Sequence, residues 1–418
     1  MPHDVRIIRM NRHCISHVAV SLHRCARRIM IGTIDRETLL AHARMIASSG
    51  GKAVPDGAKE LSDLEICGPA EITAMTRAAA ERDGSVLVSS GGTTGTPKLT
   101  YLPHHMAFDR LLPVWRPLGI GDVVLNLYDA GRMWGTHYFV QKLAERTEST
   151  VIPSGPMTAE ELELRLPMLR DVGVSALASV PSVLADFAET VLKTGVKPPV
   201  KTIIWMGEAW TESKRELVRR AFPDVQLWGI YGSVETWAMG STRPGCDETT
   251  LHLLADEIFE LEEAGALLTR AGDGWTVPVV RYRLGDRIEA AECRCGRGDA
   301  FRVLGRADDG FSLLGNYVNV ADIVESARQC PDVVDAQLVL VRDTDTADSA
   351  RSMTVEYTGA AAPEVVRSWL AGSNVRLGTV DSQHPEAISA RRVDRLRRIT
   401  RTNKTPDAVW QDALGSGS

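Results

Sequence analysis

The sequence has little charge imbalance, no long apolar run and few cysteines, and each of these absences narrows the possible functions. Its 54 acidic and 48 basic residues leave a formal net charge of -6 over 418 residues, which argues against nucleic acid as a partner. No stretch approaches the roughly 18 to 20 consecutive apolar residues of a membrane span, so we expect no membrane partner. Seven cysteines, an odd number, argue against a disulfide framework and favour a reducing, cytoplasmic setting.

The N-terminal segment is unusual because residues 5–30 contain six arginines and no acidic residue. Organelle transit peptides have this balance, and the segment lacks the apolar centre of a secretory signal. A loosely packed arm or a misassigned start codon is the interpretation that we favour over a transit peptide. We therefore expect an N-terminal arm over residues 1–30 and place no functional residue in it.

The length of the chain exceeds the size at which one hydrophobic core keeps growing, so at least two domains are expected. Short β-rich runs alternate with helical patterns between about residues 84 and 230. The runs lie at 85–89, 123–128, 149–153, 174–180, 201–207 and 225–230, with helical patterns at 158–170 and 211–221. This alternation predicts βαβ units and a mainly parallel sheet, at whose carboxyl edge ligands gather.

The pattern changes after residue 250. Residues 251–290 are strand-like without long helices and predict a small antiparallel β subdomain, and the turn formers at 305–310 mark a boundary. We therefore predict an α/β protein with two domains. Residues 31–305 form the larger one, which has mainly parallel sheets flanked by helices, and residues 306–418 form a small mobile α+β lid.

Residues 89–98 read SSGGTTGTPK and follow a predicted strand. Glycines let backbone N–H groups turn toward an anion, hydroxyls add donors, and Lys98 supplies a point charge. The segment is not a Walker A loop, because the Gly-Lys-Ser/Thr ending is missing. On composition alone, an anion-binding loop and a flexible surface turn both remain open.

This segment resembles the phosphate loop of the acyl- and aryl-adenylate-forming superfamily, and further matches occur in the family's order. They are Gly207-Glu208, the run YGSVE at 231–235, YRLGD at 282–286, GRADD at 305–309 and the late Lys404. The short chain, the Cys-x-Cys-Gly at 293–296 and the segment SVPSVLADFAE resemble the phenylacetate-CoA ligase branch and its shorter phenazine-biosynthesis relatives.

The resemblance implies a nucleotide site for ATP and Mg²⁺. Phosphates would be held by Ser89, Ser90, Thr93, Thr94 and Lys98, with Gly91, Gly92 and Gly95 allowing close backbone approach. Tyr231 would lie against adenine, Glu235 would hold Mg²⁺, and Asp286 would accept hydrogen bonds from the ribose, with Arg306 beside it. Glu208, Gly232 and Ser233 complete the implied site.

The resemblance also assigns catalysis to Lys404 together with Glu235 and Lys98. Lys404 stands out independently, since it is the last of nine lysines and the only one after Lys214, in a region with more than twenty arginines. Its ammonium would bridge the substrate carboxylate and the α-phosphate, where it stabilises developing charge. The alternative is a stray surface lysine. Asp308 matches the residue about which the family's small domain swings.

The acid-binding pocket is expected at residues 128–138 and after Glu235. The residues concerned are Tyr128, Met133, Trp134, His137, Tyr138 and Trp237. Aromatic and thioether side chains favour a flat or aromatic acid, although ordinary core packing explains each of them equally well. For His137 and Arg132, contact with the substrate carboxylate and a structural role are equally open.

Cys246, His252, Cys293 and Cys295 form a second constellation that would suit a tetrahedral structural zinc ion. Some phenylacetate-CoA ligase relatives carry a similar set. Unrelated buried cysteines are the alternative.

Five residues depart from the family pattern. They are the additional Gly92, Leu99 where glycine follows the lysine, Val234 and Leu284 in place of hydroxyl residues, and Asn403 in place of the glycine before the late lysine.

The predicted function is ATP-dependent activation of a carboxylic acid, aromatic by its pocket, as an acyl-adenylate with release of pyrophosphate. Transfer to CoA or a carrier thiol in a biosynthetic pathway would follow. A non-thiol acceptor (an amine, a reductase partner or a nitrogen nucleophile) and a nucleotide-binding protein without turnover are the alternatives. The family faintly suggests a homodimer.

Overall fold

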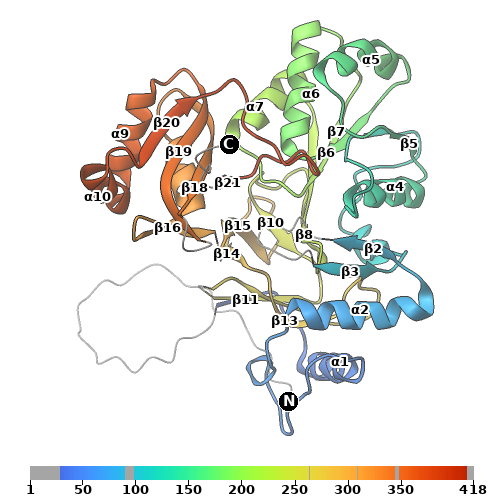
Figure 1. Cartoon of the computed structure of the whole chain (residues 1–418). Coiled ribbons are helices and arrows are strands. Elements are labelled where there is room, and N and C mark those ends of the chain that lie inside the picture. The colour runs from blue at the N-terminus through green and yellow to red at the C-terminus, as the bar shows by residue number, and fades with distance from the viewer. Residues whose placement is uncertain (1–28, 90–97, 263, 308, 344–347, 412–418) are drawn as a thin grey trace, which may run out of the picture.

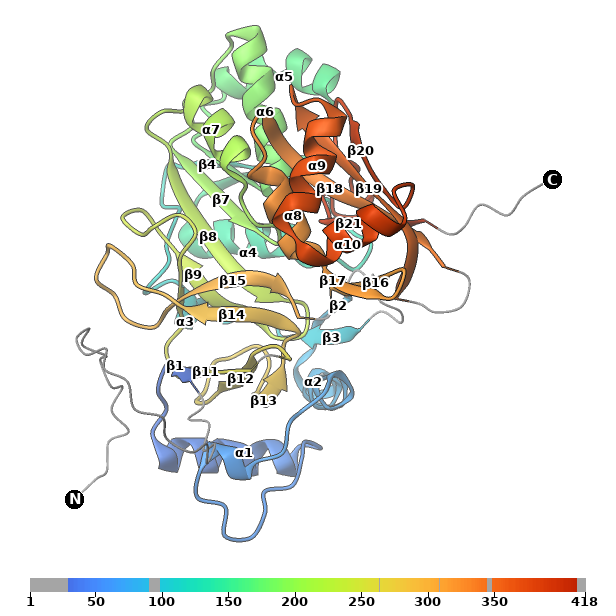
Figure 2. The same ribbon diagram turned by 90° about the vertical axis from the view of Figure 1, so that its left-hand side faces the viewer.

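The computed structural model describes residues 29–89, 98–262, 264–307, 309–343 and 348–411. A large unit carries a smaller C-terminal αβ unit, defined here as residues 310–411, which stands against helices α6 and α7 in both views (Figures 1 and 2). The mixed architecture confirms the predicted α/β fold class.

A nine-stranded sheet forms the centre of the large unit, in the order β14-β15-β10-β9-β8-β7-β6-β4-β5. Its parallel part consists of β4 (Val123–Asn126), β5 (Thr150–Pro153), β6 (Ala176–Ser179), β7 (Thr202–Met206) and β8 (Gln226–Ser233). The helices between these strands are α4 (Thr136–Thr147), α5 (Ala159–Asp171), α6 (Pro181–Thr194) and α7 (Glu212–Ala221). The predicted βαβ alternation is confirmed.

Local sequence explains where two of these helices begin. The hydroxyl of Thr158 accepts a hydrogen bond from the backbone N–H of Glu161, whose carboxylate accepts one from the N–H of Thr158 in return, which is a capping box at the start of α5. Thr211 caps α7 by accepting from the N–H of Lys214. These caps fix the strand-to-helix turns from which site residues project.

The remaining part of the large unit is mainly antiparallel. The big sheet continues through β9 (Trp237–Thr242), β10 (Leu251–Leu253), β14 (Asp286–Ala290) and β15 (Ala300–Arg306). A separate sheet contains β1 (Ile29–Ile31), β11 (Glu257–Leu261), β12 (Leu267–Arg270) and β13 (Val279–Arg283). The antiparallel character expected for 251–290 is therefore present, but its strands are shared between two sheets.

One strand of the first β-rich series behaves differently from the expectation. The run at 85–89 forms β2 (Val86–Ser89), which pairs antiparallel with β3 (Leu99–Leu102) in a two-stranded sheet and does not join the parallel sheet. The segment 90–97 is too short for the crossover that parallel pairing needs, so it returns the chain antiparallel. Ser89 is consequently paired with Leu99, and the two ends of the predicted phosphate loop lie side by side.

Helices α1 (Arg36–Ser48) and α2 (Pro69–Asp83) lie at the end of the large unit opposite α5 and α6 (Figures 1 and 2). The large unit also contains the short 3₁₀ helix η1 (Leu61–Asp63) and the single-turn α3 (Phe108–Leu111). Among the described residues, no helix has the length and apolar character needed to cross a membrane.

The C-terminal αβ unit has its own core around Phe311, Leu340 and Tyr357, all fully buried. Its strands are β16 (Gly310–Leu313), β17 (Asn316–Asn319), β18 (Val333–Arg342), β19 (Ser349–Gly359), β20 (Ile388–Arg392) and β21 (Ala408–Gln411). Its helices are α8 (Val320–Arg328), α9 (Pro363–Ser373) and α10 (Val375–Gln383). The segment between β20 and β21 leaves this unit and reaches the large one.

Candidate active site

The predicted pocket residues after β4, Glu208 after β7 and Glu235 after β8 follow the carboxyl ends of parallel strands, where such sheets collect ligands. Glu235 lies in the turn between β8 and β9, and its Oε1 is 2.8 Å from Nζ of Lys98. The Glu235 side chain is buried and Lys98 is partly exposed. The structure thus brings the end of the predicted phosphate loop to the predicted magnesium ligand.

Tyr231, Asp286 and Arg306 form a second group at the neighbouring strands. The phenol of Tyr231 donates a hydrogen bond to Asp286 Oδ2 at 2.5 Å, and Arg306 Nη1 lies 3.5 Å from Asp286 Oδ1. Asp286 and Arg306 are direct partners in the β14–β15 register, which explains their proximity. Burial, followed by the nearby negative charge of Asp286, raises the pKa of Tyr231 well above its ordinary value, so this phenol remains a donor at physiological pH.

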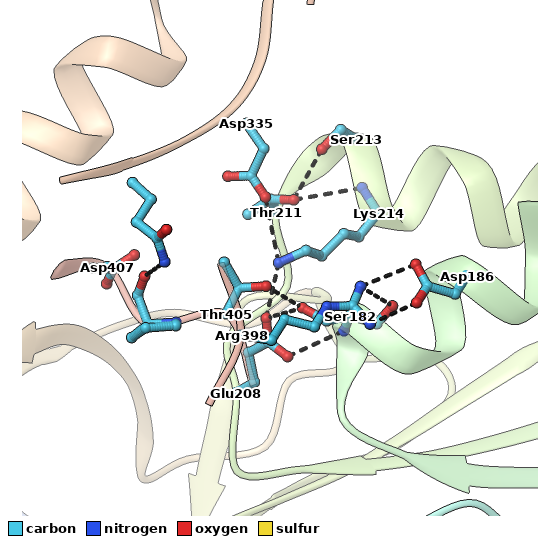
Figure 3. Close-up of polar contacts among 12 residues, drawn as sticks. Ser182, Asp186, Glu208, Thr211, Ser213, Lys214, Asp335, Arg398, Thr405 and Asp407 are labelled. Carbon is cyan, nitrogen blue, oxygen red and sulfur yellow. Dashed lines mark hydrogen bonds and ion pairs between the residues drawn. The ribbon is translucent and has the colours of Figure 1, made fainter. Parts of the chain in front are cut away.

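Glu208, which follows β7, is committed to contacts within the protein (Figure 3). Its Oε1 accepts from the Ser182 hydroxyl at 2.5 Å and from Lys214 Nζ at 2.8 Å, while its Oε2 accepts from the Ser182 backbone N–H at 3.1 Å. Ser182 lies in the first turn of α6, where a carboxylate is favoured by the helix dipole. The carboxylate therefore fixes the turn after β7, and the backbone at 207–208 is left to face the site.

Lys404 from the C-terminal αβ unit reaches this turn. Its Nζ lies 5.7 Å from the centre of the Trp134 ring, within cation–π distance. A Cβ added at Gly207 would stand 3.0 Å from both Nζ and Cε of Lys404, tighter than nearly all real contacts. Glycine at 207, with φ of 85°, is thus what permits the lysine to approach the strand end.

The environment of Lys404 disfavours its charged form. Burial lowers the pKa of Lys404 below its ordinary 10.5, the negative charge of Glu208 raises it, and the positive charge of Arg401 lowers it further. A desolvated ammonium beside a second cation gains from an incoming anion. The position suits a residue whose task is to meet a negatively charged group.

Asn403 holds Lys404 in place through an unusual backbone conformation. Its φ is 54°, in the left-handed region where glycine is at ease and asparagine is the best tolerated alternative. Its backbone N–H donates to the carbonyl of Ile399 at 2.8 Å, which closes the turn. The departure from the family's glycine therefore preserves the backbone shape.

Several contacts tie the two units together around α6 and α7 (Figure 3). Arg398 forms a bidentate pair with Asp186, at 2.5 and 2.9 Å. The hydroxyls of Ser182 and Thr405 are 2.8 Å apart, and Lys214 Nζ lies 3.4 Å from Asp335 Oδ2. A cavity of about 250 Å³ opens beside these contacts. Its lining includes Gly207, Trp210, Lys214, Arg328, Lys404 and Asp407.

Arg401 makes a further contact between the units, and our reading of the sequence missed it. Its Nη1 donates to Ser89 Oγ at 3.2 Å and to the carbonyl of Arg132 at 2.9 Å, and its Nη2 donates to the carbonyl of Ser89 at 3.1 Å. Arg132 Nη1 donates in return to the carbonyl of Thr400 at 3.3 Å. No sequence signal distinguishes Arg401 from the many arginines around it.

The predicted acid pocket separates into buried and exposed members. Trp134 stands edge-on to Tyr128, with ring centroids 5.6 Å apart, and the Tyr128 hydroxyl donates to the carbonyl of Ser179 at 2.9 Å. Trp237 packs against Gly135, where an added Cβ would meet its ring at 3.0 Å. Tyr138 and Met133 are exposed by 36% and 42%, so they lie at the surface.

His137 is engaged by the protein through both ring nitrogens. Nδ1 lies 2.6 Å from the carbonyl of Tyr128, and Nε2 lies 3.2 Å from the Gln141 amide nitrogen. These two contacts are what a structural role requires, and contact of His137 with the substrate carboxylate stays a prediction. Arg132, the other candidate for the substrate carboxylate, points to the 400–401 segment.

Cys246, His252, Cys293 and Cys295 converge on one point, with all ligand atoms within 4.8 Å of one another. Cys295 Sγ lies 3.3 Å from His252 Nε2, and His252 Nδ1 lies 2.9 Å from the carbonyl of Gly298. A carbonyl at Nδ1 fixes the proton there, so Nε2 has a free lone pair directed at the thiols. Cys246 lies between β9 and β10, His252 within β10, and the other two cysteines between β14 and β15.

Seven predicted residues lie outside the described part of the chain. They are Ser90, Gly91, Gly92, Thr93, Thr94, Gly95 and the hinge residue Asp308. Their roles stay predictions. Gly232 and Ser233 lie at the end of β8, and the Ser233 hydroxyl accepts from the backbone N–H of Thr236 at 3.1 Å within the turn that carries Glu235.

Fold and site together define a two-part α/β protein in which a C-terminal unit delivers one lysine to the carboxyl edge of a parallel sheet. The profile of the AMP-binding enzyme family matches residues 12–287, more than half of the chain. The chain therefore belongs to the AMP-binding enzyme family, which confirms the resemblance inferred from its motifs.

Two curated relatives extend this comparison. The chain is 26% identical over 250 residues to indoleacetate–lysine synthetase of Pseudomonas savastanoi, covering 57% of this chain and 62% of the relative. It is 25% identical over 266 residues to phenylacetate-coenzyme A ligase of Pseudomonas putida, covering 57% and 58%. The matched regions thus span about three fifths of the length of these relatives.

Among solved structures, 2-hydroxyisobutyryl-CoA ligase in its postadenylation state superposes with a TM-score of 0.63, at 14% identity, over 90% of this chain and 87% of that one. The same ligase in its thioesterification state gives a TM-score of 0.52. Both show the shared fold.

Proposed function

We propose that this protein activates a carboxylic acid with ATP, forming an acyl-adenylate and releasing pyrophosphate. The observation that carries the proposal is the placement of Lys404 against Gly207 and Trp134, which follow the carboxyl ends of β7 and β4. Glu235 follows the neighbouring strand β8, whose Tyr231 binds Asp286. A buried ammonium delivered by a separate unit suits a step in which charge develops on a phosphate and a carboxylate together.

The surrounding groups fit the parts of the nucleotide. Lys98 would bind the β- and γ-phosphates, and Asp286, held by Tyr231 and Arg306, would accept hydrogen bonds from the ribose. Glu235 is the residue that would hold Mg²⁺, since a hard carboxylate oxygen suits that ion. Mg²⁺ would neutralise phosphate charge during transfer. The backbone at 207–208 would border the nucleotide, because the Glu208 carboxylate is turned away toward α6.

The acid would bind on the side of Trp134 and Trp237. Trp134 lies within cation–π distance of the lysine that would meet the acid's carboxylate, Tyr128 packs edge-on against it, and Trp237 packs against Gly135. Aromatic side chains at this place support an aromatic acid. The two curated relatives, whose names contain indoleacetate and phenylacetate, support the same class.

The acceptor has two candidates. A thiol, either CoA or a carrier-protein thiol, is supported by the phenylacetate-CoA ligase relative, and an amine is supported by the relative named for lysine. Both relatives match over similar lengths. The thiol is our first candidate and the amine our second. A biosynthetic role and a cytoplasmic location belong to the same proposal.

Pyrophosphate release against a panel of aromatic and aliphatic acids tests the first step. We expect release with ATP and aryl acetic or benzoic acids, and little with short aliphatic acids. AMP release is then followed after adding CoA or lysine, and the acceptor that accelerates it identifies the second step. ATP binding without acid-dependent pyrophosphate release from any acid would instead favour a nucleotide-binding protein without turnover.

We further propose a structural zinc ion at Cys246, His252, Cys293 and Cys295. Tetrahedral ligands at about 2.0 to 2.3 Å from zinc lie about 3.5 Å from one another, and the 3.3 Å between Cys295 Sγ and His252 Nε2 fits this spacing. The imidazole is also oriented by the Gly298 carbonyl, as zinc-bound histidines usually are. Such an ion would clamp the turn before β10 to the turn between β14 and β15.

A further inference from the structure

Arg401 connects the C-terminal αβ unit to two segments of the large unit, the end of β2 and the turn before Trp134. It donates to the side chain and carbonyl of Ser89 and to the carbonyl of Arg132. Ser89 is both the last residue of β2 and the first residue of the predicted phosphate loop. One guanidinium therefore touches the loop's first residue and the turn that leads to Trp134.

The turn at Arg132 and Met133 is held in a costly backbone conformation. Their φ angles are 48° and 59°, in the left-handed region that is unfavourable for residues other than glycine. The carbonyl of Arg132 accepts from Arg401, and the carbonyl of Met133 accepts from the backbone N–H of Ser89 at 2.9 Å. The strained turn thus presents two consecutive carbonyls, one to the arginine and one to the strand that begins the loop.

The charge of Arg401 is not explained by a carboxylate partner. Within the described part of the chain, its guanidinium donates to neutral oxygens of Ser89 and Arg132, and its buried Nε has no hydrogen-bond acceptor there. The neighbouring Arg398, by contrast, pairs with the carboxylate of Asp186. A cation kept beside Lys404 and at the phosphate-loop entrance favours negative charge at that place.

We infer that Arg401 is a positioning residue for adenylation: it anchors Ser89 and the 132–133 turn only when the C-terminal unit is docked, and so couples docking to the phosphate loop. The inference rests on the proposed function. Arg401 differs in this role from Arg398. Arg398 also joins the two units, but in the large unit it contacts only α6. Loss of Arg398 weakens docking alone, whereas loss of Arg401 also releases the loop's first residue.

The test compares Arg401→Ala with Arg398→Ala in the full-length protein. For Arg401→Ala we expect the rate of pyrophosphate release to fall about 10- to 100-fold, the range for losing charge-assisted hydrogen bonds at a site. The Kd for ATP should change by less than about threefold, because the effect lies in the docked arrangement. Arg398→Ala should lose less than about fivefold, and Arg401→Lys, which keeps one donor, should lie between parent and alanine variant.

Two more variants separate a positioning role from a general structural one. Ser89→Ala combined with Arg401→Ala should cost less than the sum of the single changes, because both remove the same hydrogen bond. Arg395→Ala removes only an exposed ion pair with Glu189 of α6, at 3.8 Å, and should behave like the parent because exposed pairs contribute little. Equal losses in Arg398→Ala and Arg401→Ala would overturn the inference, since docking alone would then explain both.

A readout without turnover keeps this result distinct from a failure of the proposed function. Hydrogen exchange of β2 and β3 is measured with a non-hydrolysable ATP analogue bound. We expect faster exchange of Val86–Ser89 and Leu99–Leu102 in Arg401→Ala than in the parent or in Arg398→Ala. Unchanged exchange in Arg401→Ala would overturn the inference even if no acid substrate were found.

Discussion

Lys98 Nζ and Glu235 Oε1 form an ion pair at 2.8 Å. The pair joins the end of the segment that connects β2 and β3 to the turn after β8. In the proposed reaction these two groups would bind partners of opposite charge. The lysine would bind a phosphate, and the carboxylate would bind a cation. The pair thus keeps both residues together in one place, and in the proposed reaction ATP and Mg²⁺ would replace this ion pair with ionic contacts of their own.

Glu235→Gln tests this exchange. The amide is isosteric but neutral, so it loses both the pair with Lys98 and the strong attraction for Mg²⁺. We expect the Mg²⁺ concentration for half-maximal pyrophosphate release to rise at least about tenfold, with a lower maximal rate. Glu216→Gln, on the exposed face of α7, is the matched control and should leave the Mg²⁺ dependence as in the parent. An unchanged Mg²⁺ requirement in Glu235→Gln would rule out the assigned role.

Lys404→Ala should lower adenylation by at least about 10²-fold while ATP affinity changes little, because the lysine acts mainly on charge that develops in the transition state. Pyrophosphate release and equilibrium binding of ATP measure the two effects separately. Lys201→Ala, which removes an exposed lysine before β7, is the control. Equal adenylation rates in Lys404→Ala and the parent would refute the role.

The buried setting of Lys404 predicts an alkaline limit to activity. Burial lowers its pKa below 10.5, and the ammonium is the form that donates to the acid and the phosphate. As pH rises through this lowered pKa, the lysine loses its proton. The value of kcat/KM for adenylation should therefore decrease with rising pH, and the decrease should be centred at a pH lower than 10.5. Under saturating ATP and acid the fall should move to higher pH, because the bound anions favour the charged form.

Lys404→Arg provides the control for this pH profile. A guanidinium stays protonated throughout the range, so this variant, though slower, should lack the alkaline fall. Retention of the same fall in Lys404→Arg would assign it to another group.

Much of the fold was readable from the sequence. The β-rich runs at 123–128, 174–180 and 201–207 are short and bounded by turn formers, and each became a buried parallel strand. The run at 85–89 has the same character, yet it pairs with β3, because pairing depends on the short connection that follows it. Local pattern indicates that a strand exists, while its partner is set by the rest of the chain.

A site residue could be predicted from the sequence only where the chemistry of its side chain agrees with the motif in which it stands. Lys98 and Glu235 were expected to act on the same ligand and were found paired. Glu208 was expected at the nucleotide, but its carboxylate caps α6, a contact between residues 26 positions apart. Arg401 lies in an arginine-rich stretch in which it and Arg395 look alike, and only the docking of the two units gives it three acceptors.

Metal analysis of the purified protein tests the proposed zinc site. We expect about one equivalent of zinc, and a content below about 0.3 equivalents would contradict the site. Cys295→Ser should lower the zinc content, because a hydroxyl is a poor zinc ligand. The Tm should fall with it, because the zinc ion would hold the turn between β14 and β15 in place.

Cys330→Ser is the matched control. It alters a buried cysteine in the core of the C-terminal αβ unit, so it should lower the Tm without removing zinc. Chelation should then lower the Tm of the parent and of Cys330→Ser, and leave that of Cys295→Ser nearly unchanged. A chelator-induced loss of Tm of the same size in Cys295→Ser would show that the metal is bound elsewhere.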